Sequence, residues 1–183
     1  MFIQTEPTPN PATLKFLPGR EVMAAGTANF ANVEAAANSP LAQRLFGVDG
    51  VTGVFLGYDF ITVTKDDSQD WQELRPSVLG VIMESLTTGV PVIEGEAAAS
   101  AHTASGDDSE IVLQIKDLLD TRIRPAVAQD GGDILFQGFE DGVVYLHMQG
   151  SCSGCPSSTA TLKMGIENML KHYIPEVREV RPA

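Results

Sequence analysis

The chain has 183 residues, of which 43% are hydrophobic and 20% are charged. This composition is typical of a globular protein of one or two domains that buries its own cores. Twelve basic against twenty-four acidic residues give a net charge of −12, which disfavours binding to nucleic acid or to an anionic lipid surface. No run approaches the ~20 apolar residues that span a bilayer, and residues 1–6 lack a basic, apolar leader. We therefore expect a soluble, intracellular-type protein.

Residues 1–90 show the pattern of a first compact domain. Runs of β-branched and aromatic residues predict strands at 2–4, 13–17, 51–56 and 60–64. Ser39 and Asp70 are residue types that cap helices, and apolar residues recur at helical spacing after each, so we expect helices to begin there. The turn residues 57–59 predict a hairpin between the last two strands. Pro76 either kinks the second helix or marks its start.

Residues 91–109 differ in composition from the segments on either side. They are rich in Ala, Ser and Gly, and their acidic residues are not matched by any Lys or Arg. As a flexible coil such a segment spans roughly 24 Å root-mean-square. We therefore expect a flexible acidic linker, with His102 as a solvated residue within it.

Residues 110–183 are expected to form a second domain. A helical stripe begins at Ser109 and is predicted to end near Ile123, because Pro125 and a paired-glycine turn at 129–133 follow it. Strands 134–139 and 143–148 flank the tight-turn dipeptide Asp141-Gly142 and predict an antiparallel hairpin. A second helix is expected after Pro156, followed by an edge strand at 177–180. The expected fold class is α+β, with two small domains, each having helices packed on a small and mainly antiparallel sheet.

The chain's two cysteines, Cys152 and Cys155, lie three residues apart within Gly150-Ser151-Cys152-Ser153-Gly154-Cys155-Pro156. The intervening glycine allows the backbone to curl, so both sulfurs can converge on one point. Two cysteines in a chain of this length do not make a secreted disulfide scaffold, so we expect them to be reduced and used for chemistry or metal binding. Their position before a helix favours the charged thiolate, and we therefore expect thiol pKa values below the ordinary one.

Three uses fit the cysteine pair: a dithiol redox centre, a zinc site and an iron–sulfur site. Zinc and four-iron sites need four protein ligands, and this chain supplies two thiols with no histidine at ligand spacing beside them. His147 and His172 are expected to be ordinary surface or packing residues. Two copies that meet at their cysteine loops would complete either metal site. A redox pair needs no second copy, but it usually belongs to a βαβ unit with parallel strands, whereas an antiparallel hairpin is predicted here.

Further motifs resemble those of one family, the Nfu-type iron–sulfur scaffold proteins, whose C-terminal domain is related to the C-terminal part of NifU. The second domain resembles that domain in Ile123-Arg124-Pro125, Asp130-Gly131-Gly132-Asp133, Gly150-Ser151-Cys152, Cys155-Pro156-Ser157-Ser158 and Leu162. The first domain resembles the N-terminal domain of mitochondrial-type Nfu proteins in Thr8-Pro9-Asn10-Pro11, Leu14-Lys15-Phe16, Ser39-Pro40-Leu41-Ala42 and 59–65. The resemblance covers nearly the whole chain apart from the linker.

The resemblance implies a carrier and not an enzyme. It implies a [4Fe-4S] cluster that is bridged between two subunits, with Cys152 and Cys155 as its ligands, and that is passed to apo iron–sulfur proteins after loading by cluster-assembly donors. Homodimerisation would then occur through the cluster. Asp130 and Asp133 are interpreted as turn residues. Arg122 and Arg124 are interpreted first as helix-end charges.

The first domain carries no catalytic constellation, so our hypothesis is that it recognises donor or client proteins. A bacterial cytoplasm is the expected compartment, with a mitochondrial matrix as the alternative if the protein is eukaryotic and processed. The alternative functions are a thiol-disulfide oxidoreductase that uses Cys152 and Cys155 as its redox couple, and a zinc-bridged interaction module.

Overall fold

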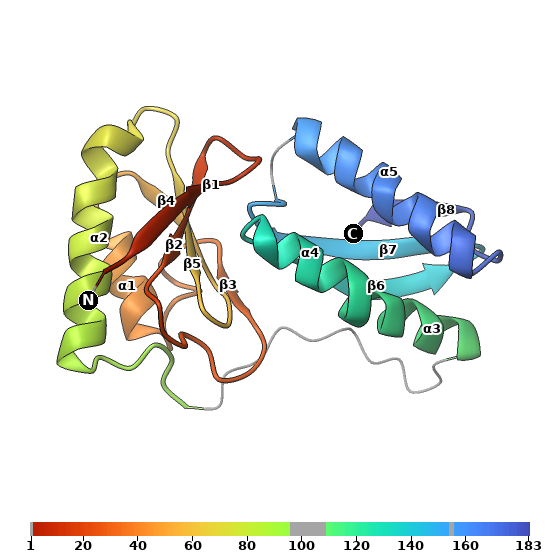
Figure 1. Cartoon of the computed structure of the whole chain (residues 1–183), viewed down its shortest axis with the longest axis horizontal. Helices are drawn as coiled ribbons and strands as arrows, with labels where there is room; N and C mark the ends of the chain where they lie inside the picture. Colours follow the sequence, from red (N-terminus) through yellow and green to blue (C-terminus); the bar gives the residue numbers. More distant parts are fainter. Residues whose placement is uncertain (1, 96–108, 154–155) are drawn as a thin grey trace. The chain divides into compact units, whose positions relative to one another are not determined.

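The computed structural model of the chain describes residues 2–95, 109–153 and 156–183, with no side-chain description for 156–159. Most of the predicted linker and Cys155 therefore lie outside the described residues. The chain divides into two units, Met1–Ser100 and Ala101–Ala183. Each is an α+β arrangement with its helices on one face of its sheet (Figure 1). The predicted fold class is confirmed.

Unit 1 contains a five-stranded antiparallel sheet with the strand order β1-β2-β5-β4-β3. Its elements are β1 (Gln4–Pro7), β2 (Thr13–Leu17), β3 (Ala28–Phe30), α1 (Pro40–Phe46), β4 (Val51–Leu56), β5 (Ile61–Lys65) and α2 (Trp71–Thr88). The predicted hairpin of β4 and β5 is present. The first strand begins later than predicted, at Gln4, and runs to Pro7. A proline is tolerated there because β1 is an edge strand, where a missing N–H costs no ladder hydrogen bond. The short edge strand β3 was not predicted.

Both helices of unit 1 begin at the predicted caps. The Ser39 hydroxyl accepts a hydrogen bond from the Ala42 N–H at 3.1 Å, and the Asp70 carboxylate accepts one from the Gln72 N–H at 2.8 Å. Pro76 lies inside α2 and does not mark its start. Val92 and Ile93 pack against the core of this unit, and the Glu94 N–H donates to the Asn38 carbonyl at 2.7 Å. Residues 91–95 therefore belong to unit 1 and not to the linker.

Unit 2 contains a three-stranded sheet with the order β6-β7-β8. Its elements are α3 (Glu110–Leu118), a π-helical turn η1 (Leu119–Ile123), α4 (Arg124–Gln129), β6 (Gly132–Glu140), β7 (Val143–Gly150), α5 (Pro156–Tyr173) and β8 (Glu179–Pro182). Strands β6 and β7 are antiparallel around Asp141 (φ 50°) and Gly142 (φ 79°), as the dipeptide predicts. The edge strand β8 starts two residues later than expected and pairs with β7 in parallel.

The first helix of unit 2 does not end before Pro125, contrary to the prediction. It continues as α4 to Gln129, because the wide η1 turn precedes Pro125. Proline lacks an N–H and its ring crowds the preceding turn, but at the first positions of a new helical segment neither property is costly. The π turn therefore allows the helix to pass a residue that normally stops it.

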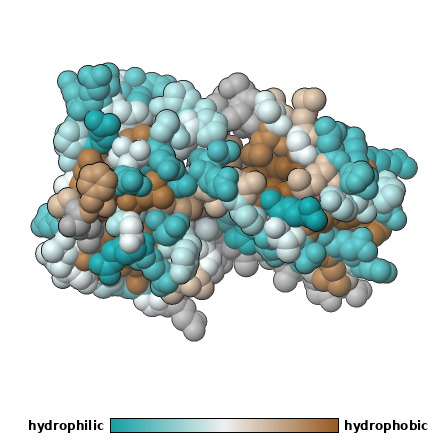
Figure 2. Space-filling model, viewed as in Figure 1, coloured by the Kyte–Doolittle hydropathy of each residue, from teal (hydrophilic) through white to brown (hydrophobic). Residues whose placement is uncertain are grey.

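The core of unit 2 lies between the helices and one face of the sheet. Val144, Leu146 and Met148 of β7 are buried there, as their alternation predicts, together with Cys152. On the faces visible in Figure 2, hydrophilic residues cover much of each unit and hydrophobic ones show in patches between them. Among the described residues, no helix combines the length and apolar character needed to cross a bilayer.

Candidate metal centre

The cysteine loop leaves the sheet where β6 begins and β7 ends. Gly132 and Gly150 are register partners at this end of the hairpin. The turn that joins α4 to β6 contains Gly131 at φ 81°, and Gly150 lies at φ 64°. Only glycine adopts these left-handed conformations readily. Two turns that require glycine therefore lie side by side at the base of the cysteine loop.

Hydrogen bonds hold the start of the loop against the turn at residues 130–131. The Ser151 N–H donates to the Gly131 carbonyl at 3.3 Å, and the Ser151 hydroxyl donates to the Asp130 carbonyl. The Ser153 N–H donates to the Gly150 carbonyl at 3.1 Å. The position of the loop is thus tied to the backbone of the α4–β6 turn.

Cys152 lies at the edge of the core with 6% of its surface exposed. A Cβ atom built on Gly132 would lie 2.6 Å from the Cys152 Sγ, 2.8 Å from the Gln149 carbonyl oxygen and 3.1 Å from the Cys152 nitrogen. The sulfur therefore rests directly against the backbone of Gly132, and only a residue without a side chain leaves room for it.

Burial raises the pKa of Cys152 to about 12, and the charges of Asp130 and Asp133 add to the rise, while the Ser151 side chain opposes it. The expected lowering of the thiol pKa is therefore wrong for Cys152. The reason is its place: it precedes α5 by several residues and is enclosed by the core, so desolvation of the thiolate outweighs any helix-terminus effect. Cys155, the residue next to α5, lies outside the described residues.

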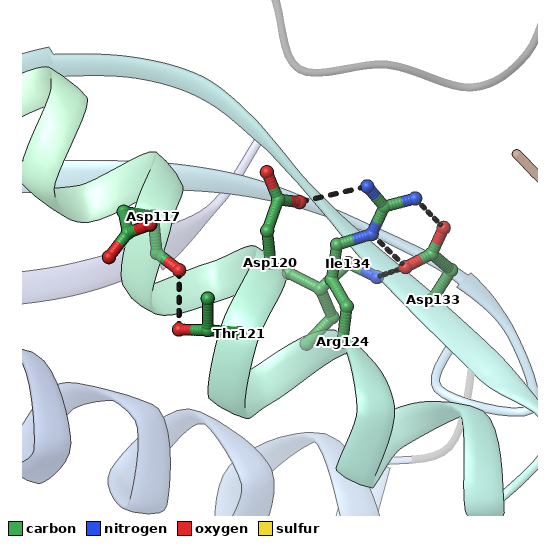
Figure 3. Close-up of polar contacts among 6 residues, drawn as sticks. All are labelled: Asp117, Asp120, Thr121, Arg124, Asp133 and Ile134. Carbon is green, nitrogen blue, oxygen red and sulfur yellow. Dashed lines mark hydrogen bonds and ion pairs between the residues drawn. The ribbon is translucent and has the colours of Figure 1, made fainter.

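Beside this turn, Arg124 and Asp133 form a bidentate ion pair (Figure 3). The Arg124 Nε and Nη2 atoms donate to the two Asp133 carboxylate oxygens, each at 2.8 Å, and Nη1 donates to Asp120 at 3.0 Å. The Asp133 Oδ1 also accepts a hydrogen bond from the Ile134 N–H at 2.8 Å. The Asp133 side chain is only 4% exposed. These contacts raise the pKa of Arg124 above its ordinary value, chiefly through the hydrogen bond to Asp133.

Sequence reasoning missed the pairing of Arg124 with Asp133. It interpreted Asp133 as a turn residue and Arg124 as a helix-end charge, and no spacing rule links residues nine apart across a turn. The π turn, which could not be read from the sequence, is what carries the helix on past Pro125. Arg122 faces elsewhere, with its guanidinium 5.1 Å from the centre of the Tyr173 ring.

Two histidines, His147 and His172, lie within the described residues, and each has a neighbour outside the cysteine loop. His172 makes an edge contact with Tyr173, with 5.0 Å between the ring centres, and His147 pairs with Leu135 across the hairpin. Within the part of the chain that the structure describes, no group of three or more His, Cys, Asp or Glu side chains is placed to hold a metal ion.

One part of the reasoning against a redox role is wrong. Strands β7 and β8 are parallel, and α5 connects them, so Cys152 precedes the helix of a βαβ unit. The antiparallel hairpin with β6 is also present, since β7 is the central strand. The predicted antiparallel pairing therefore does not count against a dithiol redox centre.

Two family models match the chain. The model described as scaffold protein Nfu/NifU N terminal matches residues 3–89, and the NifU-like domain matches residues 115–181. Together with the relatives described next, these matches show that the chain belongs to the Nfu-type family of iron–sulfur cluster scaffold proteins.

Two relatives are similar over nearly the whole chain. NifU-like protein 4, mitochondrial, from Arabidopsis thaliana is 55% identical, and the alignment covers 98% of this chain and 65% of that protein. NFU1 iron-sulfur cluster scaffold homolog, mitochondrial, from Homo sapiens is 52% identical, with 98% and 71% covered. The chain thus spans about two thirds of the length of these relatives. A solution NMR structure of a NifU-like protein from Saccharomyces cerevisiae is 29% identical, covers 52% of this chain and 87% of its own, and has a TM-score of 0.47.

Proposed function

We propose that the protein carries a [4Fe-4S] cluster bridged between two copies of the chain, with Cys152 and Cys155 of each copy as ligands, and delivers it to apo iron–sulfur proteins. The cluster is cargo, and the protein turns over no small substrate. The observation that carries this proposal is that a chain of the scaffold family has two cysteines in total, three residues apart.

The number of thiols supports a bridged site. A [4Fe-4S] cluster is held by four cysteine thiolates, and one chain contains half of that number. A two-fold axis through the cluster would bring the same loop from each copy to it. Thiolates are soft ligands suited to iron–sulfur clusters, so the donor atoms fit this cargo. Each cysteine must give up its proton when it becomes a ligand.

The relatives' names support the mitochondrial alternative for the compartment, and we propose this location over the bacterial cytoplasm. We also propose that the partners are cluster-assembly donors and apo iron–sulfur proteins. Recognition of these partners is assigned to unit 1.

Anaerobic reconstitution with iron and sulfide tests the carrier. We expect a coloured dimer with four iron and four sulfide ions per pair of chains, the content of one bridged cluster. Cys152→Ser should abolish both the colour and the dimer. The matched control is His147→Asn, which should retain both. A full cluster on a single chain, or one that survives Cys152→Ser, would contradict the proposal.

A thiol-disulfide oxidoreductase is the second candidate, and the parallel β7-α5-β8 unit favours it. This function predicts catalysis of disulfide reduction by the monomer and loss of that activity in Cys152→Ser. The zinc-bridged module predicts a colourless dimer that contains zinc and lacks sulfide. Metal and sulfide analysis, combined with a reductase assay on the same preparation, separates all three functions.

A further inference from the structure

We infer that Arg124 and Asp133 are positioning residues that hold the Cys152 thiol in place for its ligand. That the thiol is a cluster ligand rests on the proposed function, whereas the positioning itself rests on contacts within the chain. The pair lies on the α4–β6 side of the cysteine loop and does not include either cysteine.

The ion pair closes a ring of ten residues, 124–133, that contains α4 and the turn to β6. We call this the 124–133 ring. Three of the contacts described above at the start of the cysteine loop are made to this ring. The Asp130 and Gly131 carbonyls accept the two hydrogen bonds from Ser151, and Gly132 lies against the Cys152 sulfur. The ring is therefore the platform on which Cys152 rests.

The turn between α4 and β6 needs contacts on both sides to fix its conformation. Its two successive glycines, Gly131 and Gly132, have few conformational restrictions of their own. On one side, Gly132 and Asp133 pair with Gly150 and Gln149 of β7 in the sheet. On the other side, the paired contact of Arg124 with Asp133 links the start of β6 to the start of α4. A shift of Asp133 would move its neighbour Gly132 and, with it, the surface that the sulfur touches.

The geometry of the pair requires arginine. The planar guanidinium presents two parallel N–H groups to one carboxylate and a third to Asp120, whereas lysine offers a point charge without this fork. The Asp133 side chain is 4% exposed, so water has little access to replace a lost contact. Arg124→Lys should therefore keep the positive charge but no longer hold Asp133 in the same position.

The first test measures the exposure of Cys152 without any metal. The full-length chain carries Cys155→Ser, so that iodoacetamide labels Cys152 alone, and labelling is followed by mass spectrometry at fixed pH. We expect Asp133→Asn and Arg124→Lys to speed labelling on the order of ten-fold, in line with the effect of removing supporting contacts around ligands. Because Asp133→Asn also removes a charge that raises the pKa of Cys152, Arg124→Lys, which keeps the charges, decides whether the effect comes from position. The matched control is Arg122→Lys, two residues away, where the guanidinium lies over the Tyr173 ring. It should label at the rate of the parent chain.

Thermal unfolding by circular dichroism accompanies each labelling rate. A variant with a lowered melting temperature but an unchanged labelling rate in its folded range would show that the pair is only structural and overturn the inference. Arg124→Lys, the milder change, provides the labelling comparison if Asp133→Asn does not fold.

The second test uses chains with both cysteines and measures how long the reconstituted cluster resists an iron chelator. We expect a retention time about ten-fold shorter for Asp133→Asn and Arg124→Lys, and no change for Arg122→Lys. If the parent chain takes up a cluster, but the variants match it in both labelling rate and cluster retention, the positioning inference is wrong and the proposed function is unaffected. If the parent chain takes up no cluster, the proposed function fails, and the labelling rates still decide the positioning.

Discussion

Gly132 has an ordinary backbone conformation, so its importance comes from the space that it leaves and not from a turn. Two of the three atoms nearest to its missing Cβ are backbone atoms, of Gln149 and Cys152. Backbone atoms in a paired strand cannot rotate away as the end of a flexible side chain can. A side chain at this position would have to displace the cysteine loop or open the β6–β7 pairing.

We therefore predict that Gly132→Ala lowers the free energy of unfolding by about 1–3 kcal/mol, the usual cost of overpacking a buried site. It should also make Cys152 react faster with iodoacetamide. Urea unfolding monitored by circular dichroism measures the first effect, and mass spectrometry of the Cys155→Ser chain measures the second.

Gly138→Ala is the matched control on the same strand, because nothing lies within 4 Å of the Cβ position there. It should leave both the labelling rate and the unfolding free energy close to those of the parent chain. Equal effects from the two substitutions would show that the contact between Gly132 and Cys152 does not restrict the loop.

At the scale of residues, the sequence shows which side chains can act at the candidate site but not what surrounds them in the fold. The spacing of Cys152 and Cys155 identifies the candidate site directly. The burial of Cys152 and its raised pKa could not be predicted, because both depend on how closely β6 approaches the loop. The pairing of Arg124 with Asp133 was missed for the same reason: it joins two elements whose relative placement is set by packing.

At the scale of elements, strong local signals predicted helix starts and tight turns. Ser39 and Asp70 cap their helices, and the Asp141-Gly142 turn closes the β6–β7 hairpin. Element ends were predicted less well. Pro125 normally stops a helix, but the η1 turn relieves its crowding, and that turn has no signature in the sequence.

The edge strand β8 is attached to α5 through Glu167. Its carboxylate accepts hydrogen bonds from the Lys171 ammonium at 2.6 Å and from the Val180 N–H at 3.2 Å. The hydrogen bond from Lys171, followed by that from Val180, lowers the pKa of Glu167. A lowered carboxyl pKa stabilises the fold above the ordinary value and stops doing so as the pH falls through the lowered one.

We accordingly predict that Glu167→Gln is slightly less stable than the parent chain near neutral pH, because exposed ion pairs stabilise a fold only weakly. The difference should shrink as the pH falls through the lowered pKa of Glu167, because the parent chain then loses the carboxylate charge as well. Urea midpoints measured at several pH values test this. Asn168→Ala, an exposed change on the next residue of α5, should show no such pH dependence, and a difference that persists at low pH would contradict the role of the Glu167 charge.

At the scale of the whole molecule, the change in composition near residue 91 predicted two domains, and each unit has its own hydrophobic core. The class of the fold followed from the order of strands and helices. The parallel pairing of β8 was missed, because the sequence did not show which strand this four-residue segment pairs with. That pairing strengthens the redox alternative, which metal and sulfide analysis together with a reductase assay tests.

Because each unit has its own core, we predict that cluster binding and partner recognition belong to different units. The contacts of Cys152 described above all lie within unit 2: the 124–133 ring, the β6–β7 hairpin and the packing of α5. Removing residues 1–90 should therefore leave cluster uptake and dimer formation intact. It should slow delivery to an apo iron–sulfur protein, because the proposed recognition of partners resides in unit 1.

The measurement compares the full chain with the shortened one in two assays. Iron and sulfide per dimer after anaerobic reconstitution should be the same for both, whereas the rate at which an apo-protein acquires its cluster should fall for the shortened chain. Release of iron to a small chelator is the control, since a chelator needs no protein recognition and should act on both equally. Loss of uptake by the shortened chain would show that unit 1 supports the site itself, because slower delivery would then reflect a missing cluster and not a missing contact.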